Sequence, residues 1–163
     1  MRLVKNIFSW ACCLLVAGLI AYILNTYIIL NAQVITGSME STIPTNGRVF
    51  GIRSMLSPSK NRGDIIVFDS PLPDFGKPFI KRIIGLPGET IKILGGQTYI
   101  NGVALYEYYI YGISEDFGPL VVPERQFFVM GDNRGNSRDS REWGAICQST
   151  VIGRIFMDFP WFR

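Results

Sequence analysis

The hydrophobic pattern divides the chain into one long apolar segment and a longer region of short apolar runs. Residues 7–30 form a stretch of roughly 24 residues without a charged side chain, long enough for a helix to cross about 30 Å of hydrocarbon. A cleavable signal peptide is the alternative, but its apolar core usually spans only about 7–15 residues. Leu30-Asn31-Ala32 is also a poor cleavage site, because Leu is large where a small residue is required. The pattern therefore predicts a transmembrane anchor over residues 7–30.

The charges that flank this segment predict its orientation. Arg2 and Lys5 precede it, whereas the residues 31–33 that follow it are uncharged. Because positive charge concentrates on the cytoplasmic side of a membrane, residues 1–6 are expected to be a cytoplasmic N-terminus. Residues 31–163 then form an extracytoplasmic domain on a single-pass anchor. The aromatic residues of the C-terminus, at 159, 161 and 162, either touch the membrane interface or pack in the core.

Beyond residue 30 the pattern is that of β-strands separated by frequent turns. Short runs rich in β-branched and aromatic residues alternate with Gly, Pro and Asn-Gly turn signals. The strongest hairpin signal is Asn101-Gly102. Strands are expected over residues 48–53, 64–68, 77–84, 90–94, 99–100, 121–122, 126–130 and 151–156. We therefore predict a mostly β protein, with one N-terminal transmembrane helix followed by a single all-β domain of antiparallel sheets.

The cysteine content argues against an internal disulfide, and the charge balance argues against nucleic-acid binding. Cys12 and Cys13 lie inside the predicted anchor, so Cys147 has no partner for an internal disulfide and is expected to be a small core residue. Without Arg2 and Lys5, the rest of the chain carries 14 basic and 13 acidic residues. So weak a balance gives no case for binding nucleic acid.

The candidate nucleophile is Ser38, in Thr36-Gly37-Ser38-Met39, which follows the predicted anchor closely. The chain contains no histidine, so a catalytic serine would need an amine as its base. Lys81 is the best candidate, because on a strand it shares a face with Phe79 and Ile83, and apolar surroundings lower the pKa of an amine. The Ser38 amide and the Thr36 hydroxyl are candidate oxyanion donors. From the residues alone, Lys81 as a surface lysine and the serine segment as an ordinary turn remain alternatives.

A third polar segment, residues 131–141, follows an apolar run directly. It is not a calcium loop, because counting from Asp132 places Arg134 at the third position and Trp143 at the twelfth. It is not a phosphate loop either, since no Gly-Lys-Ser/Thr follows. Its arginines, aspartates and serines suit a hydrogen-bonded network that orients the lysine through a serine hydroxyl, although a solvated turn is the simpler interpretation.

At these residues the chain resembles the bacterial type I signal peptidases, membrane serine proteases with a Ser/Lys dyad. The resemblance rests on residues 36–39, 81–89 and 131–144, and a fourth block at 63–68 looks structural. It implies that the protein is anchored in the bacterial plasma membrane and removes signal peptides from exported pre-proteins. The implied partners are those pre-proteins, the lipid bilayer and, by proximity, the export translocon. No metal or cofactor is implied.

The resemblance also implies roles for individual residues. Ser38 would be the nucleophile and Lys81 the general base, with the Thr36 hydroxyl in the oxyanion hole. Ser137 would hydrogen-bond the lysine amine, Asp139 and Arg141 would form a supporting ion pair, and Asp132 would buttress the loop. The shallow pockets for small substrate side chains would be lined by Val34, Met39, Ile43, Phe79 and Ile80.

The chain departs from the family pattern at two positions. Ile35 stands where proline is common, and Gly135 replaces a frequent acidic residue, which leaves the substrate range open. A peptidase dedicated to one pre-protein remains an alternative. So do a self-cleaving repressor-type Ser/Lys protease, which the apolar span argues against, and a non-catalytic binding module on the same fold, which the intact Ser38, Lys81 and Ser137 argue against.

Overall fold

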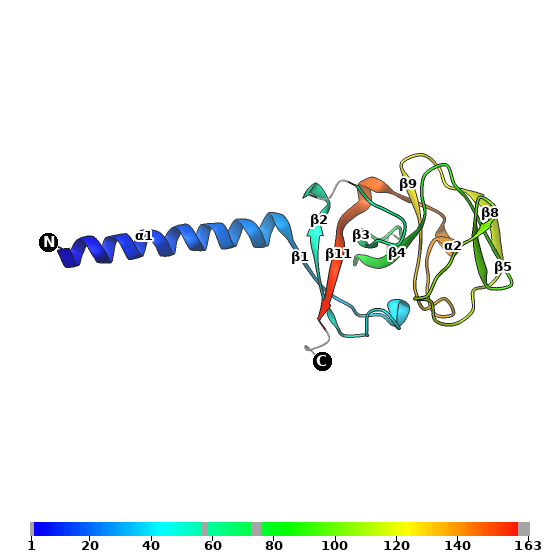
Figure 1. The fold of residues 1–163 in the computed structure, drawn as a ribbon, viewed down its shortest axis with the longest axis horizontal. Coiled ribbons are helices and arrows are strands. Elements are labelled where there is room, and N and C mark those ends of the chain that lie inside the picture. Colours follow the sequence, from blue (N-terminus) through cyan, green and yellow to red (C-terminus); the bar gives the residue numbers. More distant parts are fainter. Residues whose placement is uncertain (1, 57–58, 73–75, 160–163) are drawn as a thin grey trace.

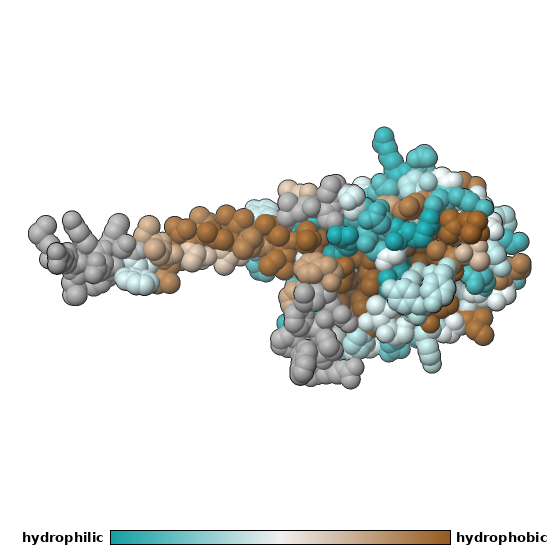
Figure 2. Space-filling model, viewed as in Figure 1, coloured by the Kyte–Doolittle hydropathy of each residue, from teal (hydrophilic) through white to brown (hydrophobic). Residues whose placement is uncertain are grey.

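A single long helix projects from a β domain in the computed structural model, which describes residues 2–56, 59–72 and 76–159 (Figure 1). Helix α1 (Arg2–Ile23) continues as a π-helical segment, η1 (Leu24–Ile28). Within it, Trp10–Ile28 is long and apolar enough to cross a membrane, with a mean hydropathy of 2.0 and no part buried. Figure 2 shows the hydrophobic side chains along this helix. Ile29 and Leu30, which the predicted span included, lie in the first strand, where they pair with the β domain.

Eleven strands form two antiparallel sheets in the described residues. The larger sheet has the order β1-β2-β11-β3-β4-β9-β10 and the smaller one the order β7-β6-β5-β8. The larger sheet comprises β1 (Ile29–Gln33), β2 (Arg48–Arg53), β3 (Ile65–Phe68), β4 (Phe79–Gly85), β9 (Gln126–Met130), β10 (Ile146–Cys147) and β11 (Val151–Phe159). The smaller comprises β5 (Thr90–Leu94), β6 (Gln97–Ile100), β7 (Val103–Ala104) and β8 (Phe117–Val121). The predicted fold class is confirmed.

Short helical turns connect the strands. They are the 3-10 turns η2 (Gly37–Met39), η3 (Ser54–Leu56) and η4 (Gln148–Thr150), and one α-helical turn, α2 (Ser140–Trp143). Asn101 and Gly102 both have positive φ, at 51° and 85°, as the predicted type I′ hairpin requires. Strand β8 spans Phe117–Val121, whereas the sequence pattern predicts a strand only over residues 121–122. Gly118 and Pro119 are uncommon in strands, so the pattern does not reveal the first part of β8.

Three hydrophobic clusters support the strands and turns that carry the candidate site residues. One lies on one face of β3, β4 and β9, and includes Phe68, Ile83 and Val129. A second joins the other face of β4 and β9 to the smaller sheet. The third, which includes Val34, Met39 and Ile43, lies beneath the turn that carries Ser38.

The prediction that Cys147 is a core residue is wrong. Cys147 is exposed, whereas its neighbour Ile146 is 4% exposed. The two residues form β10, the outermost strand of the larger sheet. Because successive side chains of a strand point to opposite faces, the packing of Ile146 turns the cysteine outward. The aromatic residues 161 and 162, and the side chain of 159, lie outside the described residues.

Candidate active site

Ser38 lies in a 3-10 turn that is fixed by hydrogen bonds from a distant loop. The turn begins after Thr36, whose backbone is extended, and Ser38 is 7% exposed. The Asn133 amide donates to the Ser38 carbonyl at 3.1 Å, and Asn133 Nδ2 donates to the Gly37 carbonyl at 3.1 Å. Below the turn, the buried Met39 side chain packs into the third cluster. The serine is therefore held by main-chain contacts that leave its hydroxyl available.

Lys81 reaches the serine from strand β4. Its side chain is on the same face as Phe79 and Ile83, as the alternation predicts, and it is only 2% exposed. The amine lies 5.9 Å from the centroid of the Phe79 ring. Burial lowers the pKa of Lys81 to about 8, and the nearby Asp139 carboxylate opposes this shift. About one tenth of this amine is therefore neutral at pH 7.

The two side chains are in direct contact. Lys81 Nζ donates a hydrogen bond to Ser38 Oγ at 2.5 Å, and once the amine is neutral the same contact lets the hydroxyl donate to nitrogen. Thr36 Oγ1 lies 3.2 Å from Ser38 Oγ. The predicted serine, lysine and threonine are therefore brought together from two segments more than 40 residues apart. This geometry suits proton removal from a serine by an amine.

Asp132 stabilises the loop after β9, in which Asn133 hydrogen-bonds to the turn that carries Ser38. Its carboxylate accepts from Arg82 Nε at 2.8 Å and Nη2 at 2.6 Å, and from the Thr42 hydroxyl. Asp132 is fully buried and Arg82 is 8% exposed, and the Tyr109 ring covers the guanidinium at 3.9 Å. Because Arg82 is next to Lys81 on β4 but faces the other way, the ion pair ties the strand that carries Lys81 to the loop.

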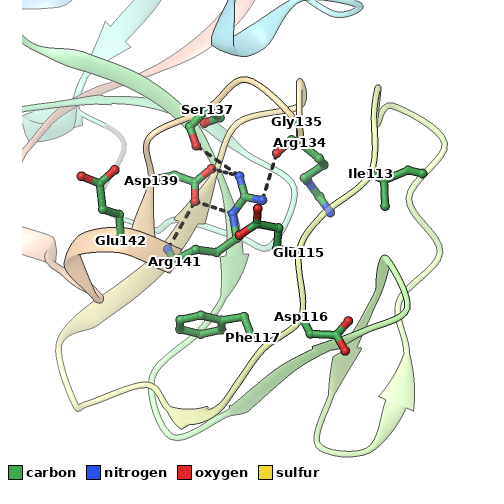
Figure 3. Close-up of a pocket in the computed structure, with 10 residues that line it drawn as sticks. All are labelled: Ile113, Glu115, Asp116, Phe117, Arg134, Gly135, Ser137, Asp139, Arg141 and Glu142. Carbon is green, nitrogen blue, oxygen red and sulfur yellow. Dashed lines mark hydrogen bonds and ion pairs between the residues drawn. The ribbon is translucent and has the colours of Figure 1, made fainter.

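A second ion pair joins Asp139 and Arg141 (Figure 3), and both charges act on the pKa of Lys81. Arg141 Nε and Nη2 donate to the two Asp139 oxygens at 2.8 and 2.9 Å, as the expected ion pair requires. The same carboxylate accepts from the Gly131 amide at 3.0 Å and precedes helix α2 as its N-cap. Burial alone would raise the pKa of Asp139, but the Arg141 hydrogen bonds outweigh it and hold that pKa below its usual value. The carboxylate therefore stays charged.

The hydrogen bond expected from Ser137 to the lysine amine is not formed. Ser137 Oγ is buried and has no hydrogen-bond partner among the described residues. The side chain instead packs against Gly131, where an added Cβ would clash with Ser137 Oγ and with the Ser38 carbonyl. The Lys81 amine is engaged by Ser38. Ser137 therefore packs closely against Gly131 at the site and makes no hydrogen bond to Lys81.

Two small pockets flank the Ser38 hydroxyl and share Thr36, Ser38 and Phe79 as walls. The first, called the apolar pocket, is otherwise lined by Val34, Met39 and Ile80, with Ile35, Pro78 and one polar residue, Gln33. The second, of about 170 Å³, is completed by Gly37, Lys81, Asn136 and Arg138. Four of the five predicted substrate-contacting residues therefore line the first pocket.

Ile43 is the exception. It is 1% exposed and packs in the third cluster, and it lines a separate cavity beside Arg82 rather than either pocket at the serine. Its amide donates to the Met39 carbonyl at 2.8 Å. Ile43 therefore supports the serine turn from below.

Several supporting residues were not identified from the sequence. Asn133 grips the serine turn, as described above, and Arg134 is 2% exposed and paired with Glu107. Arg134 lies four residues after the end of the apolar strand β9, and this proximity was the available signal that it is buried. Glu107 had no such signal, because it lies among exposed tyrosines in the connection between β7 and β8. No group of His, Cys, Asp or Glu side chains suited to a metal ion occurs within the described ranges.

Comparison with known proteins assigns this arrangement to a family. The model of the family described as signal peptidase, peptidase S26, matches residues 7–161. The chain is 36% identical over 149 residues to a probable signal peptidase I-2 of Synechocystis, covering 88% of this chain and 68% of the relative. It is 35% identical over 171 residues to signal peptidase I S of Bacillus subtilis, covering 96% and 91%. A crystal structure of a signal peptidase I from Enterococcus faecalis matches with a TM-score of 0.54 and 38% identity, over 60% of this chain and 97% of that one.

Proposed function

The chain belongs to the signal peptidase family, peptidase S26, and we propose that it removes signal peptides from pre-proteins through Ser38 as nucleophile and Lys81 as general base. The observation that carries this mechanism is the 2.5 Å contact between Lys81 Nζ and Ser38 Oγ. Both side chains are buried, and the chain has no histidine that could serve as the base instead.

Catalysis begins with the neutral form of the lysine. The amine takes the proton of the Ser38 hydroxyl as the oxygen attacks the substrate carbonyl. The resulting ammonium then protonates the leaving amine of the mature protein. In the second half of the reaction the lysine takes a proton from water, which attacks the acyl-enzyme and releases the signal peptide. The lowered pKa of Lys81, about 8, suits it to both directions of proton transfer.

The oxyanion and the substrate are held by the serine turn and its neighbours. The Ser38 amide and the Thr36 hydroxyl donate to the oxyanion, in keeping with the 3.2 Å separation of the two hydroxyl oxygens. The signal peptide lies extended between residues 33–36 and 78–80, which line the apolar pocket, and pairs with them by main-chain hydrogen bonds. Val34, Met39, Phe79 and Ile80 accept its small side chains.

The two ion pairs position these groups. Asp132 with Arg82 fixes the loop that grips the serine turn, and Asp139 with Arg141 fixes the segment beside the lysine. Ser137, which makes no hydrogen bond to Lys81 in the structure, hydrogen-bonds the amine once Lys81 has released Ser38 during the reaction. None of these residues exchanges atoms with the substrate.

The family is membrane-associated, and the apolar helix α1 fits a membrane anchor. We propose that residues 7–28 anchor the chain, since Ile29 and Leu30 pair with β2, and that residues 1–6 lie in the cytoplasm, because Arg2 and Lys5 precede the apolar span. Residues 29–163 then form the extracytoplasmic peptidase domain. This placement brings the serine turn, which follows β1 closely, near the bilayer from which a signal peptide emerges and near the export translocon.

The test is cleavage in detergent of a pre-protein with a small-x-small site. We expect wild type to cut after the second small residue, and Ser38→Ala and Lys81→Ala to give no product. Ser59→Ala and Lys92→Ala are matched controls, since both residues are exposed, and they should cut at the wild-type rate. Cleavage that survives in Ser38→Ala refutes the mechanism, and inactivity of the wild type on several such pre-proteins points to a dedicated substrate.

A further inference from the structure

The second pocket at Ser38 lies on the side of the serine from which the leaving group departs. Lys81 lines this pocket and does not line the apolar one. Because the same amine that takes the serine proton must deliver it to the leaving nitrogen, the nitrogen and the residues after it lie on the side of Lys81. The apolar pocket is then left for the side chains before the cleaved bond. This assignment rests on the function proposed above.

The second pocket, called the leaving-group pocket from here on, has a mostly apolar lining with polar groups at its rim. Phe79 and Gly37 form part of its wall beside the catalytic groups, and the exposed Asn136 and Arg138 complete it. Among the described residues that line the pocket, Arg138 carries the only permanent charge, since Lys81 must be neutral to react. The pocket is therefore open and positively charged at its rim.

The Arg138 guanidinium is held in place with one end unused. Its Nε and Nη2 donate to the Glu142 carboxylate, with Nη2 at 2.5 Å from Oε1. Nη1 makes no hydrogen bond to any part of the chain that the structure describes. Arginine presents its donors as a rigid planar fork, so Glu142 fixes the direction in which Nη1 points. Half of the Arg138 side chain remains in solvent, at 58% exposed, so a substrate group reaches it without rearrangement.

We propose that Arg138 is a specificity-determining residue that binds an acidic side chain at the first or second position of the mature protein. The carboxylate of that residue pairs with Nη1, while Asn136 offers an amide beside it. Glu142 has two opposing effects, since it orients the guanidinium and also competes for its charge. Arg138 acts on the choice of pre-protein and takes no part in bond cleavage.

The experiment compares pre-protein peptides that differ only in having Asp or Asn at the first, or at the second, mature position. The measured quantity is the ratio of kcat/KM for the Asp and Asn peptides at low ionic strength. An exposed ion pair predicts a ratio of about two to five in the wild type. Arg138→Gln should bring the ratio to about one. Arg125→Gln, which removes the same charge from an exposed residue outside both pockets, should leave the ratio at the wild-type value.

Glu142→Gln separates recognition from a structural role. Glutamine keeps an oxygen that accepts from Arg138 and so keeps the guanidinium oriented, but it removes the competing charge. If Arg138 binds the acidic side chain of the substrate, Glu142→Gln should therefore increase the preference for Asp, the opposite of the change in Arg138→Gln. If Arg138 merely braces α2 through Glu142, the two variants break the same ion pair and should change the ratio alike, which would overturn the proposal. A ratio of one at both positions in the wild type, or a preference that persists in Arg138→Gln, also overturns it. Cleavage of the Asn peptide by wild type and not by Ser38→Ala shows whether the underlying peptidase mechanism holds.

Discussion

Replacing Lys81 by methionine should abolish activity and stabilise the protein at the same time. The pKa of this amine is lowered from 10.5 to about 8, chiefly by burial. At 1.36 kcal/mol per pH unit, the shift corresponds to about 3 kcal/mol by which the folded state disfavours the ammonium. Methionine has a similar length and no charge to bury, so Lys81→Met should unfold with a free energy up to about 3 kcal/mol higher at pH 7.

The stabilisation should depend on pH in a defined window. Below pH 8 the lysine is charged in both the folded and unfolded states, and the full cost of burying the charge is present. Between pH 8 and 10.5 the folded protein loses this proton first, so the unfolded state binds more protons and wild-type stability rises with pH. The variant lacks this rise. The difference between the two proteins should therefore shrink towards pH 10.5.

The measurement is urea unfolding in a non-ionic detergent at pH 7, 8, 9 and 10. Tryptophan fluorescence suits it, because Trp143 stacks on Phe79 at 5.3 Å, close to the lysine. Lys92→Met is the matched control, since Lys92 is an exposed strand lysine, and it should change stability little at any pH. Equal pH dependence of wild type and Lys81→Met between pH 8 and 10 would refute the reasoning.

Activity should follow the same titration. The free enzyme needs the neutral amine, so kcat/KM should fall on the acid side of pH 8 and reach about one tenth of its plateau at pH 7. Substrate that covers the site excludes more water, so the corresponding pKa in the profile of kcat should lie lower. A profile that is flat between pH 6 and 9 would show that another group, or a pH-independent step, limits the reaction.

Three further predictions follow from the same geometry. Thr36→Val should lower kcat by about 10²–10³-fold with little change in KM, while Thr36→Ser should retain activity, as steady-state kinetics would show. Gly131→Ala should abolish cleavage, because its Cβ would meet backbone and side-chain atoms of the site, whereas Gly135→Ala in the same loop has room and should stay active. Asp139→Asn should move the acid limb of kcat/KM to lower pH and Arg141→Gln should move it to higher pH, since these groups respectively raise and lower the pKa of the lysine base. If the acid limbs of the two variants shift in the same direction, the ion pair only stabilises the structure and does not tune the pKa of Lys81.

Much of the fold and site could be predicted because local patterns agree with the final structure. β2, β5 and β9 match their predicted bounds, since each is a run of alternating or apolar residues ended by turns. The alternation of β4 placed Lys81 on an apolar face, and the structure confirms its burial. Family motifs then indicated roles for the serine and the lysine and one ion pair, Asp139 with Arg141. They also pointed to Asp132, but not to its partner Arg82.

The remaining features depend on contacts that no local pattern contains. Cys147 was misplaced because the sequence does not reveal that β10 is a two-residue edge strand. Ile43 carries the right side chain for a substrate pocket, but the backbone of the serine turn directs it into the core. Glu107 is an ordinary loop residue until the fold brings Arg134 to it across 27 positions. In each case the deciding partner is distant in sequence.

The pairing of Asp139 with Arg141 explains how a carboxylate can lie beside a base that must remain neutral. An unpaired buried carboxylate at this position would stabilise the ammonium form of Lys81 and raise its pKa, so that little amine would be available for catalysis. Arg141 lowers the same pKa, and it also keeps the carboxylate ionised with two hydrogen bonds at 2.8 and 2.9 Å. The pair therefore provides the acceptor that holds the Gly131 amide, while Arg141 offsets part of the effect of Asp139 on the pKa of the lysine. Burial is left as the main influence on the pKa of the base, so the apolar face of β4, which the sequence pattern predicts, sets the pH at which the enzyme works.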